Sequence, residues 1–163
     1  MRSYNYSEKI LHRICLGNKF IKRSFFELEK IFFYKSEVDF LKNKHVFITG
    51  LPRAGTTALL ENIYETGNFA SLIYEDMPFL LSPNLLSKIY KPKNFSKIER
   101  AHGDGIFYNL SSPEALDEPF FSIFKDSEVE IEFKKYVWLI LKRRKKSRYI
   151  SKNNLNYKRI KTL

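Results

Sequence analysis

The sequence predicts an α/β fold in which a parallel sheet is flanked by helices. Residues 45–50 form a β-branched, aromatic run typical of a buried strand, and a helical pattern begins directly afterwards at Thr56. A second strand pattern, Arg148–Ser151, follows a long amphipathic helix expected over residues 128–145. Strands that alternate with helices are typical of parallel sheets, which bind ligands at the carboxyl ends of their strands.

The first 44 residues are expected to form a helical segment that precedes a sheet domain over residues 45–163. Apolar side chains recur at helical spacing over residues 5–15 and again over residues 19–34. The second stretch is rich in phenylalanine. We expect these aromatic faces to pack on the sheet domain, and a partner protein is the alternative.

The region after the first strand contains a helix, a short strand and a surface excursion. The helix is predicted from Thr56 to about Glu65, with Gly67 as its stop signal. Leu72–Tyr74 is expected to be a short strand. Residues 83–97 are punctuated by proline and lysine, which indicates a loose surface segment with a short helix.

A further helix is predicted to start at Ser112, and the long helix after it ends in a basic run. Ser112 would be the N-cap and Pro113 the first helical residue, and Pro119 would end or bend this helix. The run Lys142–Lys146 suits a helix C-terminus, where cations are stabilised by the helix dipole. An acidic acceptor or a membrane surface is its alternative partner.

Composition limits the class of protein. The 163 residues suffice for one domain, and 44% hydrophobic content excludes a disordered chain. The net charge of +11 favours anionic partners but does not choose among them. Cys15 is the single cysteine, so an internal disulfide is excluded. The chain shows neither a signal-peptide pattern nor an apolar run of roughly 18 residues, and we expect a cytoplasmic protein.

The loop between the first strand and its helix has the features of a phosphate-binding loop. Gly50 and Gly55 have the G-x-x-x-x-G spacing of a P-loop, and a loop that enters a helix N-terminus presents free N–H groups. A nucleoside-triphosphate P-loop continues with lysine, whereas this chain has Thr56 there and a cation inside the loop, Arg53. A three-layer, P-loop-like fold is therefore expected, and an ordinary glycine turn is the alternative. The missing lysine disfavours a P-loop kinase.

Phe47–Thr57 resembles the 5′-phosphosulfate loop of sulfotransferases that use 3′-phosphoadenylyl sulfate (PAPS). The resemblance covers roughly residues 45 to 154, about two-thirds of the chain. It continues in four later segments, which resemble bacterial members of that family: Ala70–Phe79, Glu99–Ile106, Ser112–Phe121 and Tyr149–Asn154.

The resemblance implies transfer of a sulfuryl group from PAPS to a hydroxyl or amine acceptor, without a metal. It assigns Arg53 to the sulfate and the bridging oxygen, and Lys152 to the sulfate. Six loop residues would bind the donor: Pro52, Arg53, Ala54, Gly55, Thr56 and Thr57. The three histidines do not have metal-ligand spacing, and we expect no metal and no nucleic acid.

An acceptor needs a general base, and His102 is the first candidate. It lies beside Gly103 and near Asp104, which could orient the imidazole ring. A structural histidine is the alternative. Glu114 and Glu118 are further candidates, expected on one helix face because they are four residues apart. A capping role for Glu114 is also open.

The sequence departs from the resembled family at its C-terminal side. The resemblance implies a second donor element after Lys152, a strand and helix that supply Arg and Ser for the 3′-phosphate. Asn156–Lys161 looks like the start of a helix that is cut short. We therefore expect a truncated sheet. The alternative function is a non-catalytic nucleotide-binding remnant, or a subunit of a split enzyme that self-associates or needs a partner chain.

Overall fold

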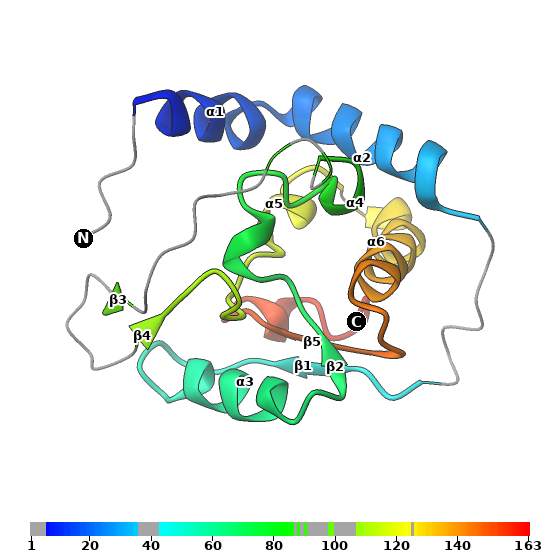
Figure 1. Cartoon of the computed structure of the whole chain (residues 1–163). Helices are drawn as coiled ribbons and strands as arrows, with labels where there is room; N and C mark the ends of the chain where they lie inside the picture. Colours follow the sequence, from blue (N-terminus) through cyan, green and yellow to red (C-terminus); the bar gives the residue numbers. More distant parts are fainter. Residues whose placement is uncertain are drawn as a thin grey trace.

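The computed structural model describes residues 6–35, 43–86, 88, 90, 98–99, 107–124 and 126–163 (Figure 1). The helices are α1 (Tyr6–Gly17), α2 (Lys19–Phe33), α3 (Thr56–Glu65), α4 (Pro83–Leu86), α5 (Glu118–Phe121) and α6 (Val129–Arg144). The strands are β1 (Val46–Ile48), β2 (Phe69–Ala70), β3 (Ile98–Glu99), β4 (Phe107–Tyr108) and β5 (Arg148–Lys152). Short 3₁₀ turns are η2 (Tyr74–Asp76), η3 (Asp126–Glu128) and η4 (Asn156–Lys158).

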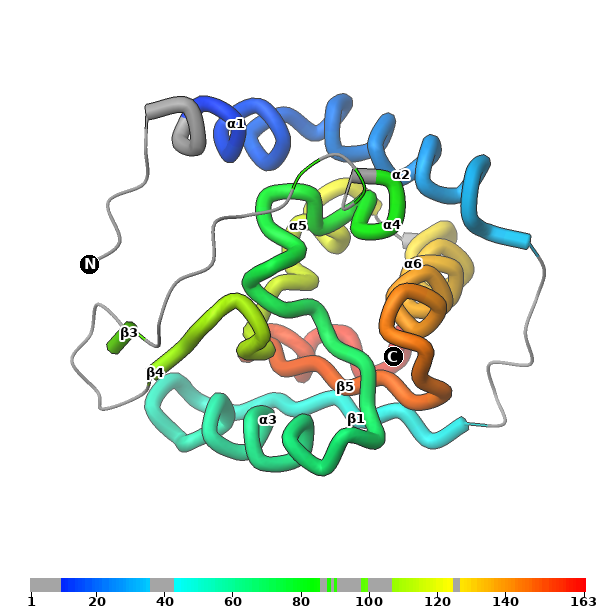
Figure 2. Tube along the Cα trace, in the orientation of Figure 1, coloured from blue at the N-terminus to red at the C-terminus, as the bar shows by residue number. Residues whose placement is uncertain are grey.

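The main sheet has three parallel strands in the order β1-β5-β2. Val46 is paired with Ile150 and Ile48 with Lys152, so β1 and β5 end at the same edge. A separate antiparallel pair joins β3 and β4. The expected α/β class, with a parallel sheet flanked by helices, is confirmed: α3 lies on one side of β1 and β5 and α6 on the other (Figure 2).

The two faces of the sheet bury different side chains, because successive strand residues point to opposite sides. Ile48 and Ile150 pack with Leu60 of α3 and Phe69 of β2 in a small cluster. Phe47 and Tyr149 face the other way and join the larger cluster around α6. The sheet thus separates a thin layer from a thick one.

The thick layer is built on stacked aromatic rings. Phe120 of α5 stacks on Tyr136 of α6, with ring centroids 4.8 Å apart and planes 11° apart. Phe26 of α2 is fully buried and meets both rings edge to face. The expected packing of the N-terminal aromatic face is therefore confirmed for Phe26, whereas Phe20 and Phe32 are exposed.

Polar side chains also fasten α2 to its neighbours. The buried carboxylate of Glu29 accepts hydrogen bonds from Asn84 N, Asn84 Nδ2 and Leu85 N, and burial raises its pKa. At the end of α2, the ring of Tyr34 meets Trp138 of α6 edge to face at 5.1 Å. The helix α2 is thus held by both α4 and α6.

Several predicted boundaries are confirmed. The helix α3 spans the residues expected, and Gly67 follows it with φ +74°. The helix α6 ends at Arg144, its C-cap Lys145 has left-handed backbone, and β5 lies where the second strand was predicted. Among the described residues, no helix is long and apolar enough to cross a membrane.

Two predicted elements are wrong. Leu72–Tyr74 is not a strand, because the pairing with β5 is made by Phe69 and Ala70. The side chain of Asp76 instead accepts from Ile73 N and starts a 3₁₀ turn at Tyr74.

The predicted helix at Ser112 is also absent, and α5 begins at Glu118. The hydroxyl of Ser112 accepts from Asn109 N and closes a turn, so it does not cap a helix. Pro113 forms an isolated antiparallel bridge with Ile73, which keeps this segment extended. Pro119 lies in the first turn of α5, where the missing N–H is tolerated.

Candidate functional site

The candidate site lies where β1 and β5 end side by side. Ile48 and Lys152 are paired across the two strands, so the loop after β1 and the segment after β5 leave the sheet together. This is the edge at which parallel sheets bind ligands.

The loop after β1 depends on two glycines for different reasons. A Cβ at Gly50 would lie 2.8 Å from Thr56 Cγ2, so a larger residue would push against the start of α3. Gly55 has φ +74°, a conformation that glycine adopts without strain. Arg53, two residues earlier, has φ +69°, and Ala54 N donates to Leu51 O at 3.2 Å to close the turn. Left-handed residues so close together are typical of backbone concavities that bind anions.

The helix α3 begins directly behind this loop. Its N-cap is Gly55, which has no side chain to satisfy the first-turn N–H groups. Thr57 is buried and Thr56 is half-buried, while the loop residues Pro52 to Gly55 are exposed. A ligand at the loop would therefore meet both exposed backbone and the positive end of the helix dipole.

The structure brings Lys152 against α3. Its ammonium donates to Thr57 Oγ1 at 3.3 Å and lies 3.8 Å from Glu114 Oε1. The side chains of Lys152 and Glu114 are only 13% and 14% exposed, so each charge is largely shielded from water. Tyr74 donates its hydroxyl to Glu114 Oε2 at 3.3 Å. A cation, a carboxylate and two hydroxyls thus meet beside the N-terminus of α3.

The segment after β5 is fixed by Asn153. Its backbone N donates to Ile48 O at 3.0 Å, which ties β5 to β1 beyond the last strand pair. Its side-chain amide donates to Asp117 Oδ1 at 3.1 Å and to Glu118 Oε2 at 2.8 Å. Asp117 is buried, and this burial raises the pKa of its carboxyl group.

Glu118 belongs to this supporting network. Both of its oxygens accept from Arg159, at 2.8 and 2.9 Å. Glu114 lies four residues earlier, outside α5, so the expectation that Glu114 and Glu118 share a helix face is wrong. Glu114 contacts Lys152, and Glu118 is held by Asn153 and Arg159.

The predicted site residues therefore fall into three groups. Thr57 and Lys152 are in contact, and Glu114 is beside them. Pro52, Arg53 and Ala54 lie exposed on the adjoining loop. His102, with Gly103 and Asp104, lies outside the described residues.

Sequence reasoning missed Tyr74, Asn153 and Asp117. Lys152 was predicted because it lies at the carboxyl end of a strand. Asn153 is the next residue, so the same signal could have identified it. Tyr74 and Asp117 carry no such signal, because their partners are 40 and 36 residues away in the chain.

No protein-family model, curated protein or solved structure matches this chain. Within the described part of the chain, no three His, Cys, Asp or Glu side chains are grouped so as to hold a metal ion. The functional argument therefore depends on the site itself.

Proposed function

We propose that this chain is a sulfotransferase with a P-loop-like fold, which binds PAPS and transfers its sulfuryl group to a hydroxyl or amine acceptor. The observation that carries the proposal is the contact between Lys152 Nζ and Thr57 Oγ1 at 3.3 Å. It joins the cation at the end of β5 to the phosphate-type loop after β1. Together they offer cationic and N–H groups that suit a phosphosulfate.

The loop and the two cations have distinct roles in this proposal. Backbone N–H groups from Gly55 to Thr57 hold the 5′-phosphate, together with the threonine hydroxyls. Lys152 and Arg53 face the sulfate and the bridging oxygen. Charge grows on that oxygen as it leaves, and a fixed cation stabilises the transition state more than the ground state.

The reaction is an in-line displacement at sulfur. The lone pair of the acceptor oxygen or nitrogen forms a bond to sulfur, and the bond from sulfur to the bridging phosphate oxygen breaks. That oxygen leaves with the electron pair on adenosine 3′,5′-bisphosphate. The acceptor proton goes to a general base.

Glu114 and His102 are the candidate bases. Glu114 is close to Lys152 and accepts from the Tyr74 hydroxyl, so it is positioned beside the loop. Glu118 is the weaker candidate because its carboxylate contacts Asn153 and Arg159, whereas that of Glu114 contacts Lys152. His102 stays a prediction from the sequence.

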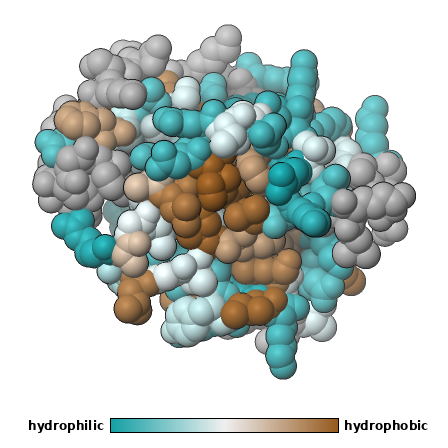
Figure 3. Space-filling model, turned by 90° about the horizontal axis from the view of Figure 1, so that it is seen from below, coloured by the Kyte–Doolittle hydropathy of each residue, from teal (hydrophilic) through white to brown (hydrophobic). Residues whose placement is uncertain are grey.

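A non-catalytic subunit is the second candidate function, and the edge of β1 favours it. Among the described residues, β1 is an outer strand of the sheet and pairs only with β5. Apolar side chains gather at the centre of the face seen in Figure 3. Leu51 and Leu59, on the loop and on α3, are 79% and 50% exposed. An open edge beside apolar surface is a place where a partner chain or second copy can add a strand.

Calorimetric binding of adenosine 3′,5′-bisphosphate tests the proposal, with ADP as the competing nucleotide. We expect the bisphosphate to bind more tightly, and Arg53→Ala to weaken it. Arg23→Ala is the matched control, because Arg23 is an exposed cation on α2 that pairs with Glu128. Equal loss in both variants, or no binding by folded protein, would argue against a donor site and for the non-catalytic subunit.

Arg53→Ala also gives the rate prediction. Once an acceptor is found, we expect the turnover rate to fall by about 10²–10³, as for other preorganised transition-state donors. The measurement is the rate of bisphosphate release at saturating PAPS. An unchanged turnover rate would show that Arg53 does not stabilise the transition state.

A further inference from the structure

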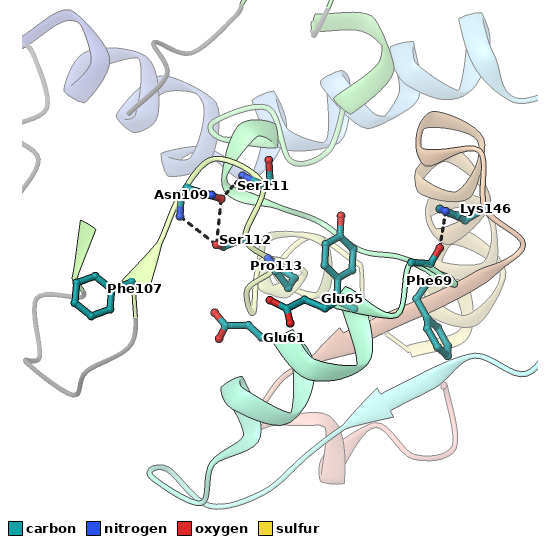
Figure 4. A pocket seen from close by; sticks show the side chains of 11 residues that line it. Glu61, Glu65, Phe69, Phe107, Asn109, Ser111, Ser112, Pro113 and Lys146 are labelled. Atoms are coloured by element: carbon teal, nitrogen blue, oxygen red, sulfur yellow. Dashed lines mark hydrogen bonds between the residues drawn. The ribbon is translucent and has the colours of Figure 1, made fainter. Parts of the chain in front are cut away.

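A pocket of about 450 Å³ opens beside the C-terminal half of α3 (Figure 4). One wall is α3, and the opposite wall is the loop that follows β4. Phe107 of β4 closes one side, and Lys146 after α6 lies at the other. A volume of this size is within the range of small-molecule sites.

The α3 wall is acidic. Glu61 and Glu65 are one helical turn apart, so both carboxylates lie along the same side of the helix, and both line the pocket. The chain as a whole carries a net charge of +11, so the charge of this acidic wall is opposite in sign to that of the protein. The ammonium of Lys146 donates to Gly67 O at the rim. Glu61 and Glu65 outweigh the single charge of Lys146, so the lining is negative on balance and favours a positively charged ligand.

The opposite wall offers neutral polar groups in fixed positions. Asn109 N donates to Ser112 Oγ at 3.1 Å, and Ser111 N donates to Asn109 Oδ1 at 2.9 Å. These bonds hold the loop before any ligand arrives. Phe107, 53% exposed, lies at the end of this wall. Such a wall suits alcohol groups beside a cation.

The pocket is linked to the candidate site through one short segment. Pro113 lines the pocket, and the next residue, Glu114, lies 3.8 Å from the ammonium of Lys152. Tyr74 donates to Glu114, and its neighbour Ile73 bridges to Pro113, so residues 73–74 fix the position of this segment. The pocket therefore adjoins the segment that contacts Lys152.

We propose that this pocket binds the ammonium end of the acceptor, which is a small organic amine that also carries hydroxyl groups. The inference rests on the proposed sulfotransferase function. Carboxylates at Glu61 and Glu65 keep the amine protonated, and an ammonium nitrogen has no lone pair to attack sulfur. The acceptor atom is therefore a hydroxyl oxygen of the same molecule.

D-Glucosamine and D-glucose are the probes, because they differ only at C2, where the first has an amine and the second a hydroxyl. We expect glucosamine to shift the amide resonances of residues 61–67 and 109–113 in an NMR titration, and to bind at least about tenfold more tightly than glucose. The double variant Glu61→Gln/Glu65→Gln should lose about tenfold in glucosamine affinity. Glu128→Gln/Glu130→Gln removes the same charge from the start of α6 and should change nothing.

Equal affinity for the two sugars, or equal loss in both double variants, would overturn the inference. Binding of adenosine 3′,5′-bisphosphate to the same samples separates the two proposals. If glucosamine binds as expected and the bisphosphate does not, the amine site stands and the sulfotransferase function fails. If only the bisphosphate binds, the amine site fails and the donor site stands.

Discussion

The ends of β1 and β5 lie side by side, yet the segments that follow them differ in how exposed their polar groups are. After β1, residues Leu51 to Gly55 are all exposed, and the loop is shaped by backbone at Arg53 and Gly55. After β5, Asn153 and Asn156 are buried, and both bind the carbonyl oxygen of Ile48. One end presents its polar groups to solvent, and the other uses them within the protein.

The loop after β1 is therefore a surface that can bind a ligand. The segment after β5 is a support that positions the residues around it. Exposed N–H groups remain available to an anion, whereas the amides of Asn153 and Asn156 hydrogen-bond within the protein. Lys152 lies between the loop and the support, since it is the last residue of β5 and contacts Thr57 of α3. We expect changes in the support to act on stability and changes in the loop to act on ligand binding.

The largest expected effect on stability comes from Asn153→Ala. The change removes the donor to Asp117 and Glu118 and the acceptor of Leu155 N, so buried polar groups lose their partners. We expect the free energy of unfolding to fall by about 3 kcal/mol in urea denaturation. Asn62→Ala removes one exposed bond on α3 and should cost less than about 0.5 kcal/mol. Similar losses in the two variants would show that the Asn153 network contributes little.

A pair of glycine variants sharpens the comparison. Gly55 and Gly67 both have φ +74°, and in both cases nothing lies within 4 Å of an added Cβ. We therefore expect Gly55→Ala and Gly67→Ala to lose a similar 1 to 2 kcal/mol, about the strain of a left-handed alanine. Only Gly55→Ala should weaken bisphosphate binding in calorimetry. If Gly67→Ala weakens it equally, the loop has no special part in recognition.

The smallest expected effect is the pH dependence of stability that comes from Asp117, a buried residue that contacts the segment after β5. Burial raises the pKa of Asp117 above its unfolded value, so its contribution to stability is complete below about pH 4 and is lost as the pH rises through the folded pKa. Asp117→Asn keeps an oxygen for Asn153 and removes the ionisation. We expect the variant to gain stability relative to the unmodified protein as the pH rises from 4 to 8. Urea midpoints at each pH give this difference, and a constant difference would contradict the assignment.

The sequence predicted the elements that depend on local pattern. Three elements were predicted correctly from the spacing of apolar residues within each segment: β1, α3 and β5. The placing of Lys152 beside the loop followed as well, because parallel strands end at a common edge. These features need no knowledge of distant contacts.

The errors and omissions arose where distant contacts override local preference. Ser112 and Pro113 have the composition of a helix start, but a turn with Asn109 and a bridge to Ile73 hold them extended. The hydrogen bonds from Asn153 to Asp117 and Glu118 were missed for the same reason, since α5 and β5 are separated in the chain by the whole of α6. Hydrogen bonds of this kind follow from the packing of α5 against the sheet.

Trp138 gives this protein a built-in optical reporter. It is the only tryptophan in the sequence, it rests on Tyr34 at the end of α2, and the ammonium of Lys142 lies 5.2 Å from its ring. Its emission therefore follows the junction between α2 and α6, on the side of the sheet opposite α3. Unlabelled protein can be followed in a fluorimeter while nucleotide is added at the loop. A spectral change would mean that occupation of the loop is transmitted through the sheet to α2.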